Sequence, residues 1–93
     1  MEIRWNELKS KRLKQTRGVS FEDILKERFV GFRLHPNRER QIYMLFEREG
    51  YIWVVPFIAD EKGIFLKTLF PHRKFTKLYQ RGELLWIPLK DLN

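Results

Sequence analysis

The sequence predicts an α+β fold: two N-terminal helices, a four-stranded antiparallel meander sheet and a C-terminal helix. Three observations carry this prediction. Helix-capping signals occur twice before residue 21, four apolar strand-like runs separated by turn signals follow from residue 29 to 70, and a proline with spaced apolar residues after it marks a last helix. Strands joined by short turns pair antiparallel, and the helices are expected on one side of the sheet. A length of 93 residues indicates one domain, residues 1–93.

Two helices are expected at the N-terminal end. The first covers residues 5–17 and ends at Gly18, because glycine reaches the positive φ of a helix C-terminus without a steric penalty. Its apolar stripe is thin and includes basic residues, so the helix should pack loosely and lean on a partner. The stripe consists of Trp5, Leu8 and Leu13. The second helix begins after Ser20, whose hydroxyl caps it while Asp23 returns the hydrogen bond.

Four strands are expected in the middle of the chain, over residues 29–34, 41–47, 51–58 and 64–70. The third is apolar on both faces, which indicates the central strand of the sheet. Pro56 interrupts this strand, and because proline has no N–H to donate, we expect a bulge or the strand end there. A polar turn at residues 35–40 and a hairpin turn at residues 60–63 connect the strands.

The last helix is expected to open at Pro71, since proline suits the start of a helix, and to end at Gly82. Its inward-facing residues are Phe75, Leu78 and Tyr79. Residues 83–93 form an apolar tail. This tail must dock on the domain or on a partner, because otherwise it would expose a sticky segment.

Composition excludes several classes of function. The chain has no cysteine, which removes disulfides, thiolate metal sites and thiol nucleophiles, and it carries no metal motif or glycine-rich phosphate loop. No apolar run approaches the ~18 residues of a membrane span, and the N-terminus lacks the pattern of a signal peptide. We therefore expect a cytoplasmic protein without membrane contact, metal or cofactor.

Positive charge is the strongest functional signal in the sequence. There are 19 Lys and Arg against 12 Asp and Glu, a net charge of +7, and such a field attracts polyanions, RNA above all. Residues 1–17 hold six basic and two acidic groups, and residues 72–82 hold four basic groups and no acid. Two basic segments on either side of a nearly neutral, aromatic middle favour a patch over a uniform coat.

Cationic and aromatic residues gather in the expected turn at residues 35–40 and at the junction of the last strand and the last helix. RNA cleavage without metal needs a base for the 2′-hydroxyl, cations for the phosphate and an acid for the 5′ oxygen. Arginine suits the phosphate through its bidentate donors, while histidine, tyrosine or a lysine of lowered pKa can move protons. The residues that could supply these groups are His35, Arg38, Arg40, Lys67, His72, Arg73, Lys74 and Tyr79.

These residues also have plain structural interpretations. Lys67 can protect an edge strand from aggregation. Arg73, Lys77 and Arg81 recur every four residues, which is also the pattern of a solvated helix face. Tyr79 can belong to the core, as most of the aromatic residues do.

Three segments carry a distinctive pattern. The chain opens with Ile3-Arg4-Trp5-Asn6 and Lys9, followed by Arg17-Gly18-Val19-Ser20-Phe21-Glu22-Asp23. A His-x-x-Arg element follows at residues 35–38, and residues 73–79 read Arg-Lys-Phe-Thr-Lys-Leu-Tyr. Over roughly residues 3–80 the chain thereby resembles the BrnT-type toxins of type II toxin–antitoxin systems. That family has Ser-Ala-Arg before its last helix, where this chain has Pro71-His72-Arg73, so only the arginine carries over.

The resemblance implies a RelE-like and ParE-like fold, and a metal-independent endoribonuclease that blocks translation. It also implies a protein partner, a ribbon-helix-helix antitoxin that neutralises the toxin in a hetero-oligomer. The residues expected to catalyse are Arg73 and Lys67, on the phosphate, and His72 or Tyr79, on protons. The residues expected to bind RNA are Arg38, Arg40, Lys74, Lys77 and Arg81.

Three alternatives stay open at this point. The first is a nucleic-acid-binding module without catalysis, in which cations meet phosphates and aromatics meet bases. The second is a toxin on this fold that acts on a protein, as ParE relatives act on gyrase. In the third the basic surface serves an acidic partner protein, and the first helix is the candidate surface.

Overall fold

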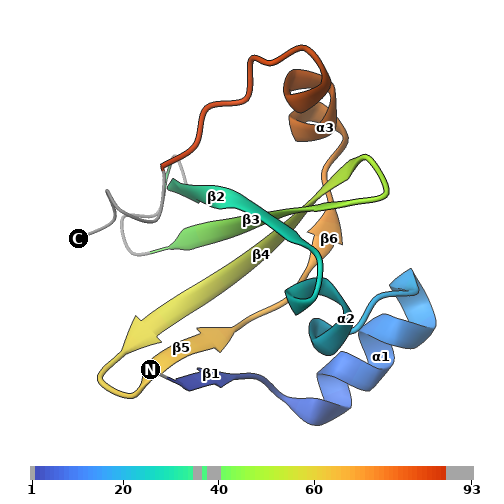
Figure 1. Cartoon of the computed structure of the whole chain (residues 1–93). Coiled ribbons are helices and arrows are strands. Elements are labelled where there is room, and N and C mark those ends of the chain that lie inside the picture. The colour runs from blue at the N-terminus through green and yellow to red at the C-terminus, as the bar shows by residue number, and fades with distance from the viewer. Residues whose placement is uncertain (1, 35–36, 38–40, 88–93) are drawn as a thin grey trace.

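The computed structural model describes residues 2–34, 37 and 41–87, and it has an α+β fold (Figure 1). The elements in chain order are β1 (Glu2–Arg4), α1 (Glu7–Arg17), α2 (Phe21–Leu25), β2 (Arg28–Leu34), β3 (Ile42–Arg48), β4 (Tyr51–Asp60), β5 (Gly63–Leu66), β6 (Phe70–Pro71) and α3 (Arg73–Gln80). Among the described residues the sheet has six strands in the order β1-β5-β4-β3-β2, and β6 pairs with β4.

The expected four-stranded antiparallel meander is wrong in its details. Strands β2 to β5 do follow one another antiparallel, but β1 joins the sheet at its far edge and runs parallel to β5, so the sheet is mixed. A three-residue strand carries too little alternation to be recognised in the sequence, and only its pairing with Gly63, Ile64 and Phe65 makes it a strand.

The C-cap of α1 and the N-cap of α2 confirm the sequence prediction, whereas α1 begins at Glu7, two residues later than expected, because the Asn6 side chain caps it. Gly18 ends α1 in the left-handed region with φ of 76°, and its N–H donates to the Lys14 carbonyl. Ser20 and Asp23 form the expected reciprocal capping box of α2. The Lys14 ammonium, with the Ser20 N–H, lowers the pKa of the Asp23 carboxyl to about 2. Leu8 was expected in the apolar stripe of α1, but its side chain is exposed. The buried residues of this helix are Ser10 and Leu13.

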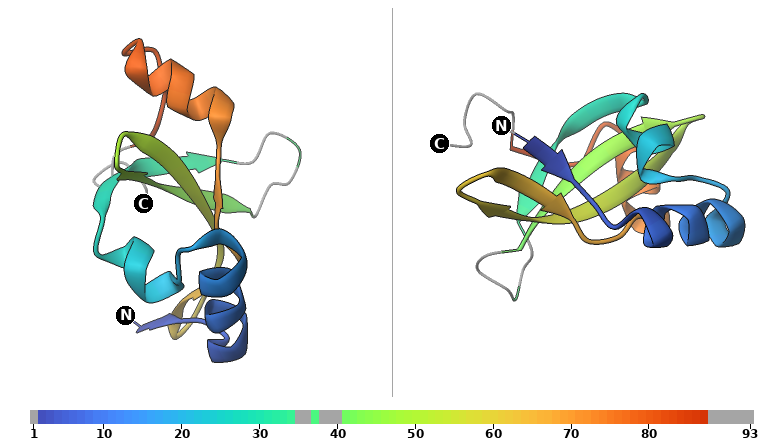
Figure 2. Two further views of the ribbon diagram at one scale, coloured as in Figure 1. Left: turned by 90° about the vertical axis from the view of Figure 1, so that its right-hand side faces the viewer. Right: turned by 90° about the horizontal axis from the view of Figure 1, so that it is seen from below.

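Helices cover both faces of the sheet, which corrects the expectation that they lie on one side. Two separate cores result, and the sheet passes between the α1–α2 pair and α3 (Figure 2). The residues of α1 and α2 pack with Met44, Phe46, Trp53, Val55 and Phe57. The residues of α3 pack with Leu45, Ile52 and Val54. The alternation within β3 and β4 sends successive side chains to opposite faces, so two apolar faces require two layers of cover.

Pro56 lies inside β4 without ending it. The Pro56 carbonyl accepts the Lys67 N–H at 2.9 Å on the side of the sheet away from β3. The nitrogen and carbonyl of one strand residue point to the same side, so no β3–β4 hydrogen bond is lost at the proline. On that other side β4 pairs with β5 from Phe57 onward and with β6 at Trp53 and Val54. Strand β4 therefore continues through Pro56 without a bulge. The break in pairing lies in the next strand along the chain, which is divided into β5 and β6 opposite the proline.

The strand expected over residues 64–70 is in fact divided into β5 and β6. Pro71 belongs to β6, so the expectation that it opens the last helix is wrong, and α3 begins at Arg73 with His72 as its N-cap. The His72 N–H donates to the Ile52 carbonyl at 2.9 Å, which holds the chain in the sheet one residue beyond the proline. The end of the helix agrees with expectation, because Gly82 follows it with φ of 71°.

The beginning of the C-terminal tail docks on β2. Leu84 is buried with the α3 core, and Ile87 exchanges both backbone hydrogen bonds with Phe32, at 3.0 and 2.7 Å. This confirms docking on the domain for the described part of the tail. Leu85 and Trp86 remain exposed. Among the described residues, no helix has both the length and the apolar character required to cross a membrane.

Candidate nucleic-acid interface

Helix α3 is fixed to the sheet by a buried polar contact. The Thr76 hydroxyl accepts the backbone N–H of Ile52 at 2.8 Å and donates to the His72 carbonyl at 2.8 Å. Thr76 is 3% exposed and Ile52 is fully buried, so this contact is shielded from water. Phe75 and Leu84 pack beside it in the same core. One face of α3 is therefore committed to the sheet and the opposite face is left to solvent.

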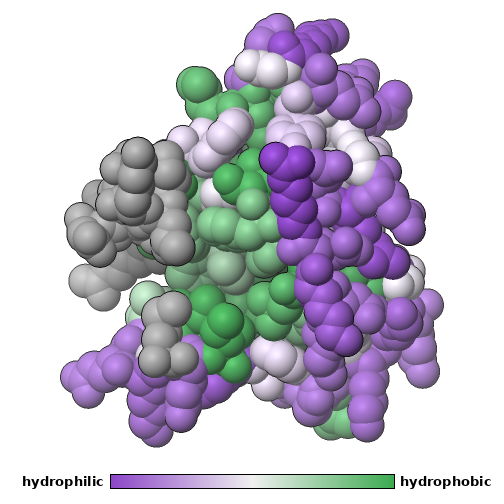
Figure 3. All heavy atoms as spheres, in the orientation of Figure 1, coloured by the Kyte–Doolittle hydropathy of each residue, from purple (hydrophilic) through white to green (hydrophobic). Residues whose placement is uncertain are grey.

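The solvent face of α3 is cationic. We call it the α3 cationic face and define it by Arg73, Lys74, Lys77 and Arg81, the last being the C-cap. All four side chains are exposed, α3 contains no acidic residue, and none of the four makes an ion pair with any part of the chain that the structure describes. Figure 3 shows hydrophilic residues along this side of the molecule, from α3 at the top towards α1.

The first turn of α3 departs from the usual charge arrangement of helices. The N-terminal end of a helix carries partial positive charge and favours acidic residues, as α2 shows with Glu22 and Asp23. In α3 the first turn instead holds Arg73 and Lys74 and no acidic residue. Cations at a positive helix end oppose its stability, and departures of this kind are expected where a site serves a ligand. The ligand that relieves such a charge excess is an anion.

His72 has a structural duty at the start of this helix. Its Nδ1 accepts the Phe75 N–H at 3.1 Å, and its ring stacks on the Phe75 ring with centroids 3.7 Å apart. Burial lowers the pKa of His72, and the charges of Arg33 and Lys74 lower the pKa further. The imidazole is therefore neutral near pH 7, with its proton on Nε2. In this state His72 is a hydrogen-bond donor, and it has no free lone pair to act as a base.

Tyr79 lies on the inward side of α3, apart from the cations. Its hydroxyl donates to Glu47 Oε1 at 2.7 Å, and this hydrogen bond raises the pKa of Tyr79 above its usual value. The side chain packs against the α3 core. The structure thus places Tyr79 beside the sheet and does not bring it to the α3 cationic face.

Lys67 lies in the connection between β5 and β6, with an exposed side chain. Its backbone is opposite Pro56, whereas His72 is opposite Ile52, so the two positions are about 13 Å apart along β4. The residues expected in the turn before β3, namely His35, Arg38 and Arg40, lie outside the described residues.

One basic residue of this region was missed in the sequence. Arg33 lies in β2, its guanidinium carbon is 4.6 Å from the centroid of the Phe75 ring, and its charge acts on His72. The available signal was the period of two, which puts Arg33 on the opposite face from Phe32 and Leu34. The pattern of residues 29–34 predicts a strand and gives Arg33 no role in a site.

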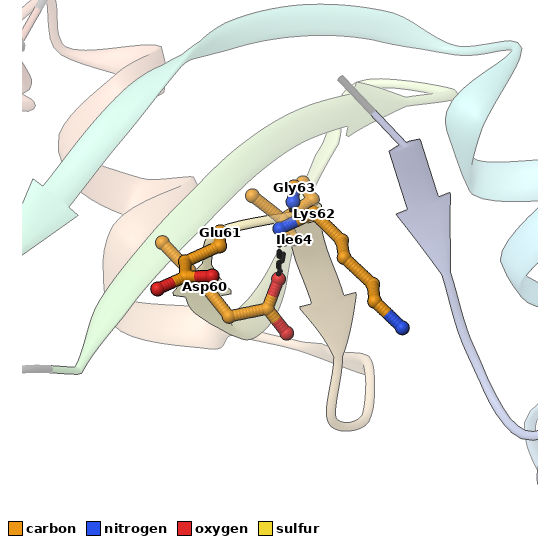
Figure 4. Close-up of a pocket in the computed structure, with 6 residues that line it drawn as sticks. Asp60, Glu61, Lys62, Gly63 and Ile64 are labelled. Atoms are coloured by element: carbon orange, nitrogen blue, oxygen red, sulfur yellow. Dashed lines mark hydrogen bonds between the residues drawn. The ribbon is translucent and has the colours of Figure 1, made fainter.

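Two other polar regions lie elsewhere on the molecule. On α1, Lys14 is paired with Asp23 and the Arg17 guanidinium donates to the Leu69 carbonyl, so two of the five cations of this helix are engaged within the protein. A cavity of about 420 Å³ lies at the β4–β5 hairpin, lined by Ala59, Asp60, Glu61, Lys62, Gly63 and Ile64 (Figure 4). Its Asp60 carboxylate already accepts from the N–H groups of Lys62 and Gly63. Within the described residues no His, Asp and Glu side chains gather as three metal ligands.

No protein-family model, curated protein or solved structure matches this chain.

Proposed function

We propose that this chain binds RNA through the α3 cationic face and cleaves it without metal, as the toxin of a toxin–antitoxin pair. The observation that carries the binding step is a set of four exposed cations on one helix, with no acid on the helix and no ion pair to the described residues. Cations that are not neutralised within the protein are the groups that displace counterions from a phosphate backbone. The resemblance to BrnT-type toxins supports the catalytic step and the antitoxin partner.

The first turn of α3 gives the cleavage step its most suitable groups. In metal-independent cleavage the 2′-hydroxyl loses its proton to a base, its oxygen bonds to the adjacent phosphorus, the bond from phosphorus to the 5′ oxygen breaks, and the 5′ oxygen takes up a proton. Negative charge grows on the phosphate oxygens during this exchange. Because His72 and Tyr79 are engaged in the fold, water accepts the first proton and supplies the second. Arg73 and Lys74 supply cations for that charge, and the Nε2–H of His72 supplies a neutral donor beside them. His72 therefore suits stabilisation of the phosphate rather than removal of the 2′ proton.

Binding without cleavage is the second candidate function. It is favoured by the engaged state of both expected proton carriers, since His72 Nδ1 caps α3 and the Tyr79 hydroxyl donates to Glu47. A binding module needs neither group free, whereas a nuclease needs a base. Purified protein separated from any antitoxin decides between the two, because a nuclease degrades RNA in EDTA and a binding module leaves it intact.

We expect the double variant Arg73→Gln and Lys74→Gln to bind single-stranded RNA more weakly and with a smaller dependence on salt. Each lost phosphate contact reduces the slope of log affinity against log salt by about 0.7. Fluorescence anisotropy with a labelled oligonucleotide over a salt series measures both quantities. Lys11→Gln with Arg12→Gln removes the same charge from α1 and is the matched control. An equal loss in both double variants contradicts a specific role for α3.

We expect His72→Asn to fold normally and to cleave RNA at least about 100-fold more slowly, the effect of removing one donor to a developing oxyanion. Asparagine still caps a helix, so the start of α3 is kept, whereas His72→Ala also loses the cap and about 1 kcal/mol of stability. Cleavage rates with a defined RNA and thermal unfolding separate the two roles. If His72→Asn cleaves RNA at the wild-type rate, the role of His72 is limited to capping α3.

Growth arrest by the wild-type chain while cellular RNA stays intact contradicts the nuclease proposal. Supercoiling by gyrase in the presence of the chain then tests the protein-target alternative.

A further inference from the structure

Arg33 is held between the C-terminal tail and α3. Its Nη1 donates to the Leu85 carbonyl at 2.8 Å, and its guanidinium carbon lies 4.6 Å from the centroid of the Phe75 ring. The first contact fixes the guanidinium from the tail, and the second is a cation–π contact from the first turn of α3. The tail and α3, which are distant from β2 in the sequence, therefore fix the position of the Arg33 guanidinium at the edge of the sheet.

This position adds Arg33 to the charge at the start of α3. Phe75, on which Arg33 rests, is the residue against which the His72 ring stacks. The guanidinium of Arg33 and the ammonium of Lys74 are the two charges that act on the His72 imidazole, one from β2 and one from α3. Cations from β2 and α3 thus lie near the same imidazole, that of His72. Like charges repel one another, so this arrangement favours an anion as a ligand.

The guanidinium of Arg33 retains capacity for a ligand. Arginine has five N–H donors, and the Leu85 carbonyl takes one of them. The side chain is partly exposed, and it forms no ion pair with a carboxylate of the described residues. The other guanidinium donors of Arg33 meet no acceptor among the described residues. A planar guanidinium in this state beside other cations is suited to bidentate contact with a phosphate.

The tail is built to keep the Leu85 carbonyl in place. On one side Leu84 is buried in the α3 core, and on the other Ile87 makes its paired hydrogen bonds with Phe32. Trp86 packs on Gly31, where a Cβ would lie 2.7 Å from Trp86 Cγ. Only glycine allows this approach, and the pairing of β2 with β3 shifts register between Phe29 and Gly31, so β2 is shaped at Gly31 to receive the tail.

We propose that Arg33 is a further phosphate-binding residue of the α3 site, and that residues 84–87 are the segment that positions it. This inference rests on the proposed RNA binding and adds to it a residue from a second element. It also gives the docked tail a function besides covering the edge of the sheet.

Arg33→Gln is expected to weaken binding of a labelled single-stranded RNA roughly tenfold, the loss of one charge-assisted contact. Arg73→Gln should show a loss of similar size, and Arg12→Gln on α1 is the control for the change in net charge. Arg33→Lys keeps the charge without the planar fork, so its affinity should fall between those of wild type and Arg33→Gln. Wild-type affinity in Arg33→Gln, with Arg73→Gln weakened, overturns the inference and leaves the proposed function standing. Wild-type affinity in both overturns the proposed function itself.

Ile87→Pro tests the tail, because proline cannot donate to the Phe32 carbonyl. We expect Ile87→Pro to weaken RNA binding in the wild-type and Arg73→Gln backgrounds. In the Arg33→Gln background it should cause no further loss of affinity, because the tail acts through the contact that Arg33→Gln already removes. Gly31→Ala, which displaces Trp86, provides a second disturbance of the same segment if Ile87→Pro folds poorly. Full additivity with Arg33→Gln overturns the positioning role.

A readout without RNA follows from the neighbouring imidazole. The pKa of His72, measured by NMR titration, is expected to rise in Arg33→Gln, because one of the two cations that lower the pKa is removed while Lys74 remains. If the tail holds Arg33, Ile87→Pro also raises that pKa. An unchanged pKa in Ile87→Pro, together with a raised pKa in Arg33→Gln, shows that Arg33 stays in place without the tail and overturns that part of the inference.

Discussion

Thr76→Val is expected to lower the free energy of unfolding by about 2 kcal/mol, although the substitution keeps the shape of the side chain. The Ile52 N–H is buried and donates to the Thr76 hydroxyl at 2.8 Å, so valine leaves this donor without a partner. The His72 carbonyl keeps a second donor, the Thr76 N–H at 3.0 Å, so the main loss is at Ile52.

Denaturant unfolding measures the change in stability, and hydrogen exchange of the Ile52 amide locates it. Thr16→Val is the matched control, because the Thr16 hydroxyl donates to the Arg12 carbonyl in an exposed position of α1. We expect the control to change stability by less than about 0.5 kcal/mol. Equal losses in the two variants contradict the anchoring role of Thr76. An intact protein with a freely exchanging Ile52 amide shows that α3 is loosened while the rest of the fold remains.

Gly63→Ala is expected to destabilise the protein by about 3 kcal/mol and to release β1 from the sheet. Gly63 has φ of 145°, a region that L side chains rarely occupy, and a Cβ there would lie 2.6 Å from the backbone nitrogen of Glu2. The obstacle is main chain, so no rotation of a side chain can relieve the clash. Either the hairpin distorts or the parallel pairing of β1 with β5 is lost.

Gly50→Ala separates backbone strain from the clash. Gly50 also has positive φ, at 80°, but nothing lies within 4 Å of a Cβ placed there. This variant should therefore cost about 1 kcal/mol, from strain alone. Thermal unfolding compares the two, and faster amide exchange over residues 2–4 in Gly63→Ala identifies release of β1. Comparable losses in the two glycine variants contradict the close approach of β1 at Gly63.

Local signals explain why much of the fold was predictable. Gly18 ends a helix because of its own backbone freedom, and Ser20 with Asp23 caps the next helix through contacts three residues apart. The strands β2, β3 and β4 are recognised from runs of apolar residues bounded by turn signals, which are also local. The basic solvent face of α3 likewise follows from a spacing of four residues and from the absence of acids.

Pro71 shows how a local signal can mislead. Proline suits a helix start, yet this proline lies in β6, since its neighbour Phe70 pairs with Val54 and the His72 N–H bonds to Ile52. These are contacts with residues far away in the sequence, and they extend the strand by one residue, to Pro71. His72 then becomes the cap, which changes the chemistry available to it, because capping occupies Nδ1.

The sequence by itself determined the C-terminal ends of α1 and α3, the cap that starts α2, most of the strands and the concentration of positive charge on α3. Each of these depends on neighbours within about one helical turn or two strand residues. Only the tertiary structure decided that β1 runs parallel to β5, that α3 lies on the face opposite α1, and that Arg33 joins the first turn of α3. These features depend on pairings between distant segments: β1 with Gly63, the tail with Phe32, and Arg33 with Phe75. Such pairings are selected by the burial and hydrogen bonding of the whole chain, which no local pattern encodes.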